Sequence, residues 1–95
     1  MKFIGMSFNE INRIEDEELR REGIEWYLQD LEDSLQVLSD RFVEVNAGEL
    51  ITVAIDKNVF IDFANWVGKF NEIHPADRCI RRWFIFGELI IEEGI

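Results

Sequence analysis

The 95-residue sequence contains only one cysteine, one histidine and one proline. Because Cys79 has no second cysteine to pair with, no disulfide can form within the chain, which favours a reducing compartment. No apolar run approaches the roughly 18 residues that cross a membrane, and the opening residues lack the apolar core of a signal peptide. We therefore expect a cytoplasmic protein that does not insert into membranes.

The sequence also lacks the motifs that identify common enzymes and metal proteins. His74 and Cys79 are five positions apart, so they would not meet on one helix face as a nucleophile and its base. One histidine and one cysteine do not make a zinc site without carboxylates at a suitable spacing. Asp56 and Asp62 stand among apolar residues and are candidates for desolvated acids, although helix caps or strand ends explain them equally well. We expect no enzyme, no cofactor and no bound metal.

Basic residues are scarce in this chain. Ten Lys and Arg oppose 20 Asp and Glu, which gives a formal net charge of −10. The imbalance is strongest between residues 10 and 33, where ten carboxylates oppose three arginines. Such a field repels phosphate backbones and attracts basic surfaces, including surfaces that normally hold nucleic acid. The simpler alternative is that the charge only keeps a small protein in solution.

Apolar and aromatic residues are plentiful enough for one compact core. They make up 47% of the chain and include eight Phe, so we expect a single folded domain over residues 1–95. The clearest pattern begins near Asp16, where a helix is predicted to run to Phe42. Gly23 weakens this helix by roughly 1 kcal/mol relative to alanine, unless another element packs closely there. Six apolar residues, spaced three or four apart, form its buried stripe: Ile24, Leu28, Leu31, Leu35, Leu38 and Phe42.

Shorter patterns predict the elements around this helix. Lys2–Phe8 has β-forming residues in rough alternation and is predicted to be a strand. Asn9–Glu15 is predicted to be a connection, and Ser7 with Glu10 has the spacing of a capping box. A hairpin is predicted between Phe42–Val45 and Leu50–Ile55, connected by Asn46, Ala47 and Gly48.

The last third of the chain returns to helical spacing. Asn58 is a candidate N-cap for a helix that follows it, and Pro75–Phe86 is predicted to form another helix. Residues 83–93 are also strongly β-forming, so helix and strand stay open there. The fold class is therefore α+β: a small single domain with a short, mostly antiparallel sheet, a long amphipathic helix packed on one face and one or two further helices.

The face of the long helix opposite the apolar stripe is acidic. Its carboxylates recur about every 5 Å along the axis, and few Lys or Arg are placed to relieve their repulsion. A helix selected only for stability would alternate charges. The repulsion between these carboxylates costs a little stability, which indicates that the row has a function. We name this set the acidic row and expect it to bind a partner: Glu18, Glu22, Glu25, Glu32, Asp33 and Asp40.

Trp26 lies beside the acidic row and belongs to neither face. With Leu19 and Val37 it forms a second apolar line, about 120° from the buried stripe. Either a neighbouring element covers this line, or Trp26 is an exposed anchor for a partner. Arg78, Arg81 and Arg82 form the only basic cluster in the sequence, and they either pair with the acidic row, within the fold or across a dimer, or coat the last helix.

Three functions are compatible with these features. The first is a non-enzymatic inhibitor that occludes a basic, nucleic-acid-binding site on a partner protein, as anti-restriction, anti-CRISPR and toxin-immunity proteins do. It would not bind nucleic acid directly. The second is a small homo-oligomeric accessory subunit whose acidity serves solubility. The third is a ligand-binding domain or enzyme with a cleft near Trp66, His74 and Cys79.

Overall fold

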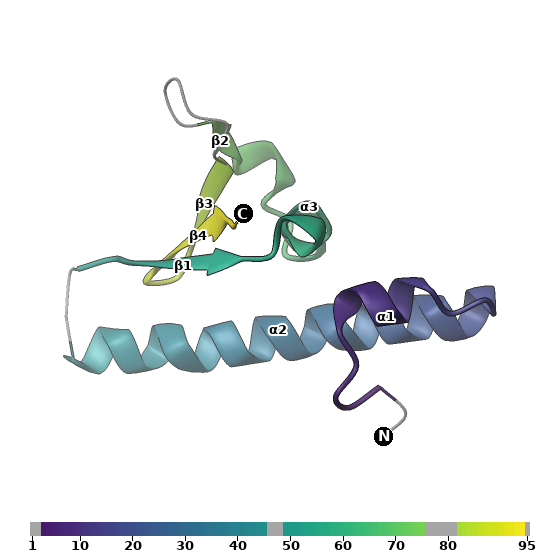
Figure 1. The fold of residues 1–95 in the computed structure, drawn as a ribbon. Coiled ribbons are helices and arrows are strands. Elements are labelled where there is room, and N and C mark those ends of the chain that lie inside the picture. The colour runs from purple at the N-terminus through teal and green to yellow at the C-terminus, as the bar shows by residue number, and fades with distance from the viewer. Residues whose placement is uncertain (1–2, 46–48, 76–81, 95) are drawn as a thin grey trace.

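The computed structural model describes residues 3–45, 49–75 and 82–94, which form a small α+β domain (Figure 1). None of the described helices has the length and hydropathy needed to cross a bilayer. The helices are α1 (Phe8–Asn12), α2 (Glu17–Val45), α3 (Lys57–Trp66) and the 3-10 turn η1 (Phe70–Glu72). The strands are β1 (Ile51–Ile55), β2 (His74–Pro75), β3 (Arg82–Phe86) and β4 (Leu89–Glu93).

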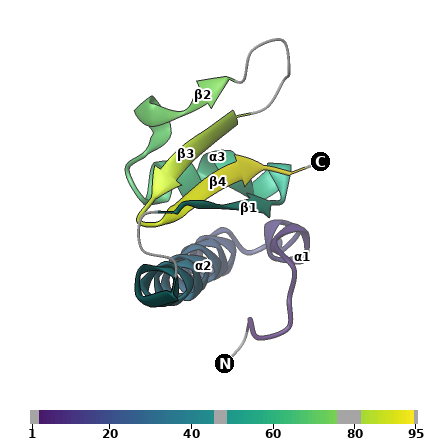
Figure 2. The same cartoon turned by 90° about the vertical axis from the view of Figure 1, so that its left-hand side faces the viewer.

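The four strands form one mixed sheet in the order β1-β4-β3-β2 (Figure 2). The β2–β3 and β3–β4 pairs are antiparallel, and the β1–β4 pair is parallel. Ile91 is opposite Val53 on one side and Phe84 on the other, so these three side chains lie on the same face. The predicted mostly antiparallel sheet is confirmed.

The core lies between one face of this sheet and the helices. Phe84 and Ile91 of the sheet are fully buried with Phe60 and Phe63 of α3, and the Phe60 and Phe84 ring centroids are 5.6 Å apart. Residues that alternate with these along the strands point to the opposite face, where Ile85 remains 44% exposed. The described helices therefore cover the sheet on one side only.

The long helix α2 follows its predicted pattern closely. Its first turn is capped by Asp16, whose Oδ1 accepts the backbone N–H of Leu19 at 3.0 Å. Leu28 and Leu35 are buried, and the other members of the predicted stripe pack against the same core. The helix ends at Val45, about one turn beyond the predicted end at Phe42.

A hydrogen bond connects α2 to the turn between β3 and β4. The hydroxyl of Ser39, which is 2% exposed, accepts the backbone N–H of Glu88 at 2.8 Å. Gly87 in this turn has φ +58°, and a Cβ there would collide with the Ser39 hydroxyl. The turn therefore needs both the backbone freedom and the small size of glycine.

The predicted strand Lys2–Phe8 is wrong, because residues 3–7 are not part of any strand, and Lys2 lies outside the described residues. Residues 3–5 form a turn, and α1 begins at Phe8. The Ser7–Glu10 capping box is present, with Ser7 Oγ accepting the Glu10 N–H at 3.1 Å. The capping hydrogen bonds favour a helix start over the weak β alternation of the residues that precede it.

Gly23 is where this segment meets α2. A Cβ at Gly23 would lie 2.8 Å from Cγ2 of Ile11 and 2.9 Å from Cε1 of Phe3, both of which are buried. Another element does pack closely at this glycine, because Phe3 and Ile11 of α1 lie against its backbone. Figure 1 shows α1 alongside this part of α2.

Two predictions in the second half of the chain are wrong. Phe42–Val45 is the last turn of α2, and β1 pairs with β4 instead of forming a hairpin. Asn46, Ala47 and Gly48 lie outside the described residues. The predicted helix Pro75–Phe86 is replaced by β2 and β3, since Phe84 and Phe86 face the core with a period of two.

The ends of these elements also differ in detail. Residues 76–81, with Arg78, Cys79 and Arg81, lie outside the described residues. For residues 83–93 the sequence did not decide between helix and strand, and the structure shows the β3–β4 hairpin there. The helix predicted after Asn58 is α3, but its N-cap is Asp56, whose Oδ1 accepts the Asn58 N–H at 2.8 Å. This assigns Asp56 the helix-cap role.

Candidate partner-binding surface

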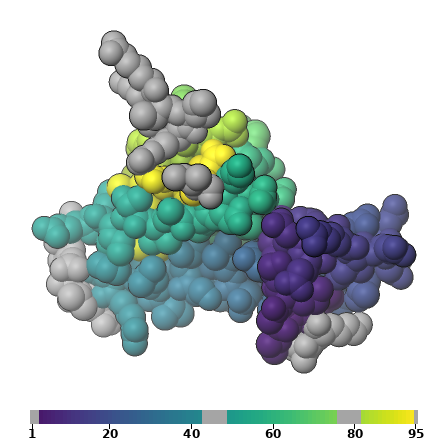
Figure 3. All heavy atoms as spheres, viewed as in Figure 1, coloured from purple at the N-terminus to yellow at the C-terminus, as the bar shows by residue number. Residues whose placement is uncertain are grey.

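The acidic row lies along α2 and is mostly open to solvent. Five of its members are exposed: Glu18, Glu22, Glu25, Asp33 and Asp40. From the first to the last they cover about 33 Å of helix axis. Figures 1 and 3 show that the N-terminal half of α2 projects beyond the sheet, with α1 alongside it. The first three of these carboxylates are in that projecting half.

No ion pair among the described residues engages the acidic row. The ion pairs shown between two described residues are Lys69–Glu72 at 3.1 Å and Arg82–Glu93 at 3.8 Å. Arg82, one member of the predicted basic cluster, therefore pairs within the sheet rather than with α2. Within the described structure the negative charge of the row is not neutralised by Lys or Arg of the same chain.

Two glutamines fill the spaces between carboxylates of the row. The side-chain amide of Gln29 donates to Oδ1 of Asp33, and that of Gln36 donates to Oδ1 of Asp40, each at 3.0 Å. Such i,i+4 pairs stabilise a helix by roughly 0.2–0.5 kcal/mol each. Because the amides are neutral, these hydrogen bonds orient the two carboxylates and leave their charge unchanged.

Glu32 differs from the other members of the acidic row. It is half-buried, and its Oε1 accepts the indole N–H of Trp66 at 2.9 Å. This bond joins α2 to the last residue of α3. Glu32 therefore has an internal structural contact, and its predicted role in binding a partner stays a prediction.

Trp26 is half-buried under the N-terminal segment. Its ring centroid is 6.1 Å from that of Phe3, at an interplanar angle of 37°. Leu19 in the same apolar line is also half-buried, whereas Val37 is 59% exposed. Phe3, which precedes α1, contacts Trp26, and part of the Trp26 surface stays open.

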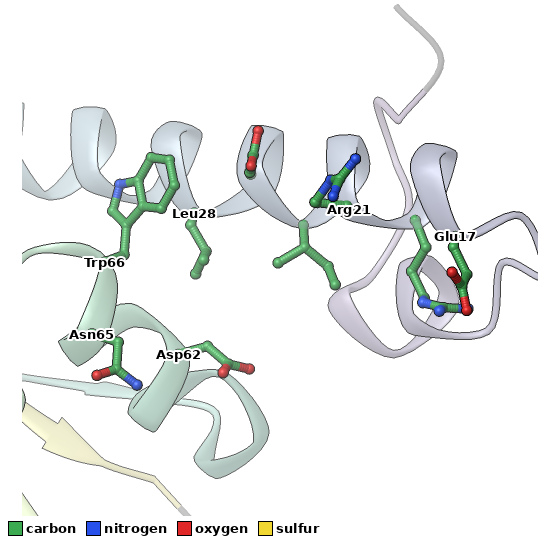
Figure 4. A pocket seen from close by; sticks show the side chains of 9 residues that line it. Glu17, Arg21, Leu28, Asp62, Asn65 and Trp66 are labelled. Carbon is green, nitrogen blue, oxygen red and sulfur yellow. The ribbon is translucent and has the colours of Figure 1, made fainter.

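An open groove of about 510 Å³ lies between α2 and α3, beside the acidic row (Figure 4). Its floor is apolar, with Leu28 buried and Ile24 half-buried. Trp66 and Asp62 reach it from α3. The remaining lining residues are Glu17, Arg20, Arg21, Glu25 and Asn65.

The sequence placed Trp66 near a cleft, but with different neighbours. His74 lies in β2, where its ring is 4.9 Å from that of Trp83, and Cys79 is outside the described residues. The groove instead lies between Trp66 and α2, where Trp66 is bonded to Glu32, 34 positions away, and no local spacing signals that contact. Among the described residues, no three His, Cys, Asp or Glu side chains are grouped so that they would hold a metal ion.

Comparisons with protein-family models, with curated proteins and with solved structures gave no match to this chain.

Proposed function

We propose that this chain is a non-enzymatic acidic binding protein that occludes a basic site on a partner protein. The partner site is one that normally holds nucleic acid, so the chain acts as an inhibitor of the anti-restriction, anti-CRISPR or toxin-immunity kind, in the cytoplasm. One observation carries this proposal. Five of the six carboxylates of the acidic row are exposed, and no described Lys or Arg pairs with the row.

The charge supports electrostatic attraction more than detailed imitation of a duplex. Double-stranded DNA carries about one charge per 1.7 Å, or roughly 20 charges over the length of the acidic row, whereas the row itself has five exposed carboxylates. Further exposed carboxylates lie near the ends of α2, at Glu15, Glu17 and Glu49. The field of the whole molecule steers a basic partner, and the partly open Trp26 adds apolar contact.

A second candidate function is a homo-oligomeric accessory subunit. The observation that favours it is the uncovered face of the sheet, where Ile85 is exposed and Trp83 and Ile90 are half-buried. In this alternative a second copy covers these side chains, and the acidic row serves solubility. A dimer mass in solution that reverts to a monomer on Ile85→Lys would favour it.

Affinity capture followed by a salt titration tests the first proposal. The tagged chain is incubated with lysate and washed at increasing NaCl, and the captured proteins are identified. A basic nucleic-acid-binding protein that is released as salt rises is expected, because exposed charges are screened beyond about 10 Å at 0.1 M salt. Capture of no basic protein, or capture that is indifferent to salt, would count against the proposal.

A further inference from the structure

The groove between α2 and α3 has one feature that the acidic row alone lacks, an aromatic ring held in place. Trp66 is 37% exposed, and its indole N–H is already bonded to Glu32. That bond restrains the ring while leaving part of its surface in the groove (Figure 4). A restrained, partly exposed indole ring is the best aromatic acceptor for a cation placed over its face.

The charges around this ring are negative. Asp62 precedes Trp66 by one helical turn on α3, so both side chains lie on the same side of the helix. Glu25 lines the groove from α2, and Glu32 is at the Trp66 indole. The α3 wall of the groove contributes no Lys or Arg.

The two arginines of the groove both come from the first half of α2. Arg20 is half-buried, and its Nη1 donates to the backbone carbonyl of Ile14 at 2.8 Å, so it serves the connection between α1 and α2. Arg21 is exposed and comes from the turn of α2 before Glu25, apart from the Trp66 ring (Figure 4).

We propose that this groove receives an arginine side chain of the basic partner. The guanidinium group stacks on Trp66 and pairs with Asp62, and the methylene stem covers the apolar floor at Ile24 and Leu28. Arginine suits this site better than lysine because its planar group both stacks on a ring and pairs with a carboxylate. This inference rests on the proposed function, since it names the chemical group by which the partner is held.

The test uses a probe that does not require the partner. The ¹⁵N-labelled full chain is titrated with an acetylated and amidated Gly-Arg-Gly peptide, and the Trp66 indole resonance is followed after assignment by its loss in Trp66→Phe. A matched peptide with citrulline in place of arginine has nearly the same shape without the charge. A saturable shift with the arginine peptide, in the millimolar range expected for one anchoring side chain, supports the proposal.

Two carboxylate variants make the test specific. Asp62→Asn removes the charge in the groove, and Asp30→Asn removes one from an exposed position elsewhere on α2. Asp62→Asn is expected to weaken binding of the arginine peptide about two- to fivefold, whereas Asp30→Asn leaves it unchanged. Equal shifts with the citrulline peptide, or equal effects of the two variants, would overturn the proposal.

A titration with inorganic phosphate tests the alternative that the groove binds an anion. If phosphate moves the Trp66 resonance and the arginine peptide does not, the groove binds anions through Arg21 and the inference is wrong. Failure of this inference is distinguishable from failure of the proposed function. If Asp62→Asn has no effect on binding of the arginine peptide but partner capture still depends on the acidic row, only the inference about the groove is wrong.

Discussion

The indole N–H of Trp66 donates a hydrogen bond to Oε1 of Glu32 at 2.9 Å, although the two residues are 34 positions apart. This contact fixes the end of α3 against α2 and divides the acidic row by role. Glu18, Glu22 and Glu25 lie in the projecting half of the helix without an internal partner in the described structure, whereas Glu32 stabilises the fold.

The Trp66–Glu32 contact predicts energetic coupling between the two residues. Trp66→Phe removes the hydrogen bond and Glu32→Gln weakens it, so the double variant should lose less stability than the two single losses combined. The coupling expected for one partly exposed hydrogen bond to a charged group is about 0.5–1.5 kcal/mol, measured by urea unfolding of all four proteins. Strict additivity would show that the contact does not persist in solution.

Ser39 predicts a difference between two serines of the same helix. Ser39→Ala leaves the Glu88 N–H without its acceptor in a partly buried turn and should cost about 1–3 kcal/mol. Ser34 is exposed on α2, and Ser34→Ala should be neutral or slightly stabilising because alanine favours helices. Thermal unfolding of both variants measures the difference, and equal stability would mean that the Ser39–Glu88 hydrogen bond does not form in solution.

Gly23 predicts that a helix-favouring substitution is harmful. In an exposed helix, Gly→Ala stabilises by about 1 kcal/mol. At Gly23 the added methyl group collides with Ile11 and Phe3, which are buried, so Gly23→Ala should instead cost about 1–3 kcal/mol. Urea unfolding measures the sign of the change. A gain in stability would mean that α1 and Phe3 do not rest on α2 in solution.

The sequence predicted those elements whose signals are local. The stripe from Ile24 to Phe42 predicted α2, and Ser7 with Glu10 predicted the capping box of α1, because helix periodicity and capping act within a few residues. At Gly23 the sequence left two possibilities open, a weakened helix or a closely packed neighbour, and the structure shows the closely packed neighbour.

The elements that were missed depend on distant contacts. β1 was assigned to a hairpin with its sequence neighbours, but it pairs with β4 at the other end of the chain. The β3 residues Trp83–Phe86 fit helix and strand patterns alike, and pairing with β4 decides between them. The acidic row lies on a single helix, so its spacing in the sequence predicted it. The groove at Trp66 could not be predicted in this way, because it forms only where α3 packs on α2.

The most direct test of the central claim compares two charge-reversed variants in partner capture. Glu22→Lys with Glu25→Lys reverses two exposed carboxylates of the acidic row, and Asp30→Lys with Glu72→Lys makes the same change in net charge outside it. Both variants should fold, since exposed charges contribute little to stability.

We expect the first variant to lose the captured basic partner and the second to retain most of it at about 0.1 M salt, where distant charges are screened. Loss of capture by both variants to the same degree would show that only net charge matters. Undiminished capture by the first variant would contradict the account, because the acidic row of α2 would then not be the surface that binds the partner.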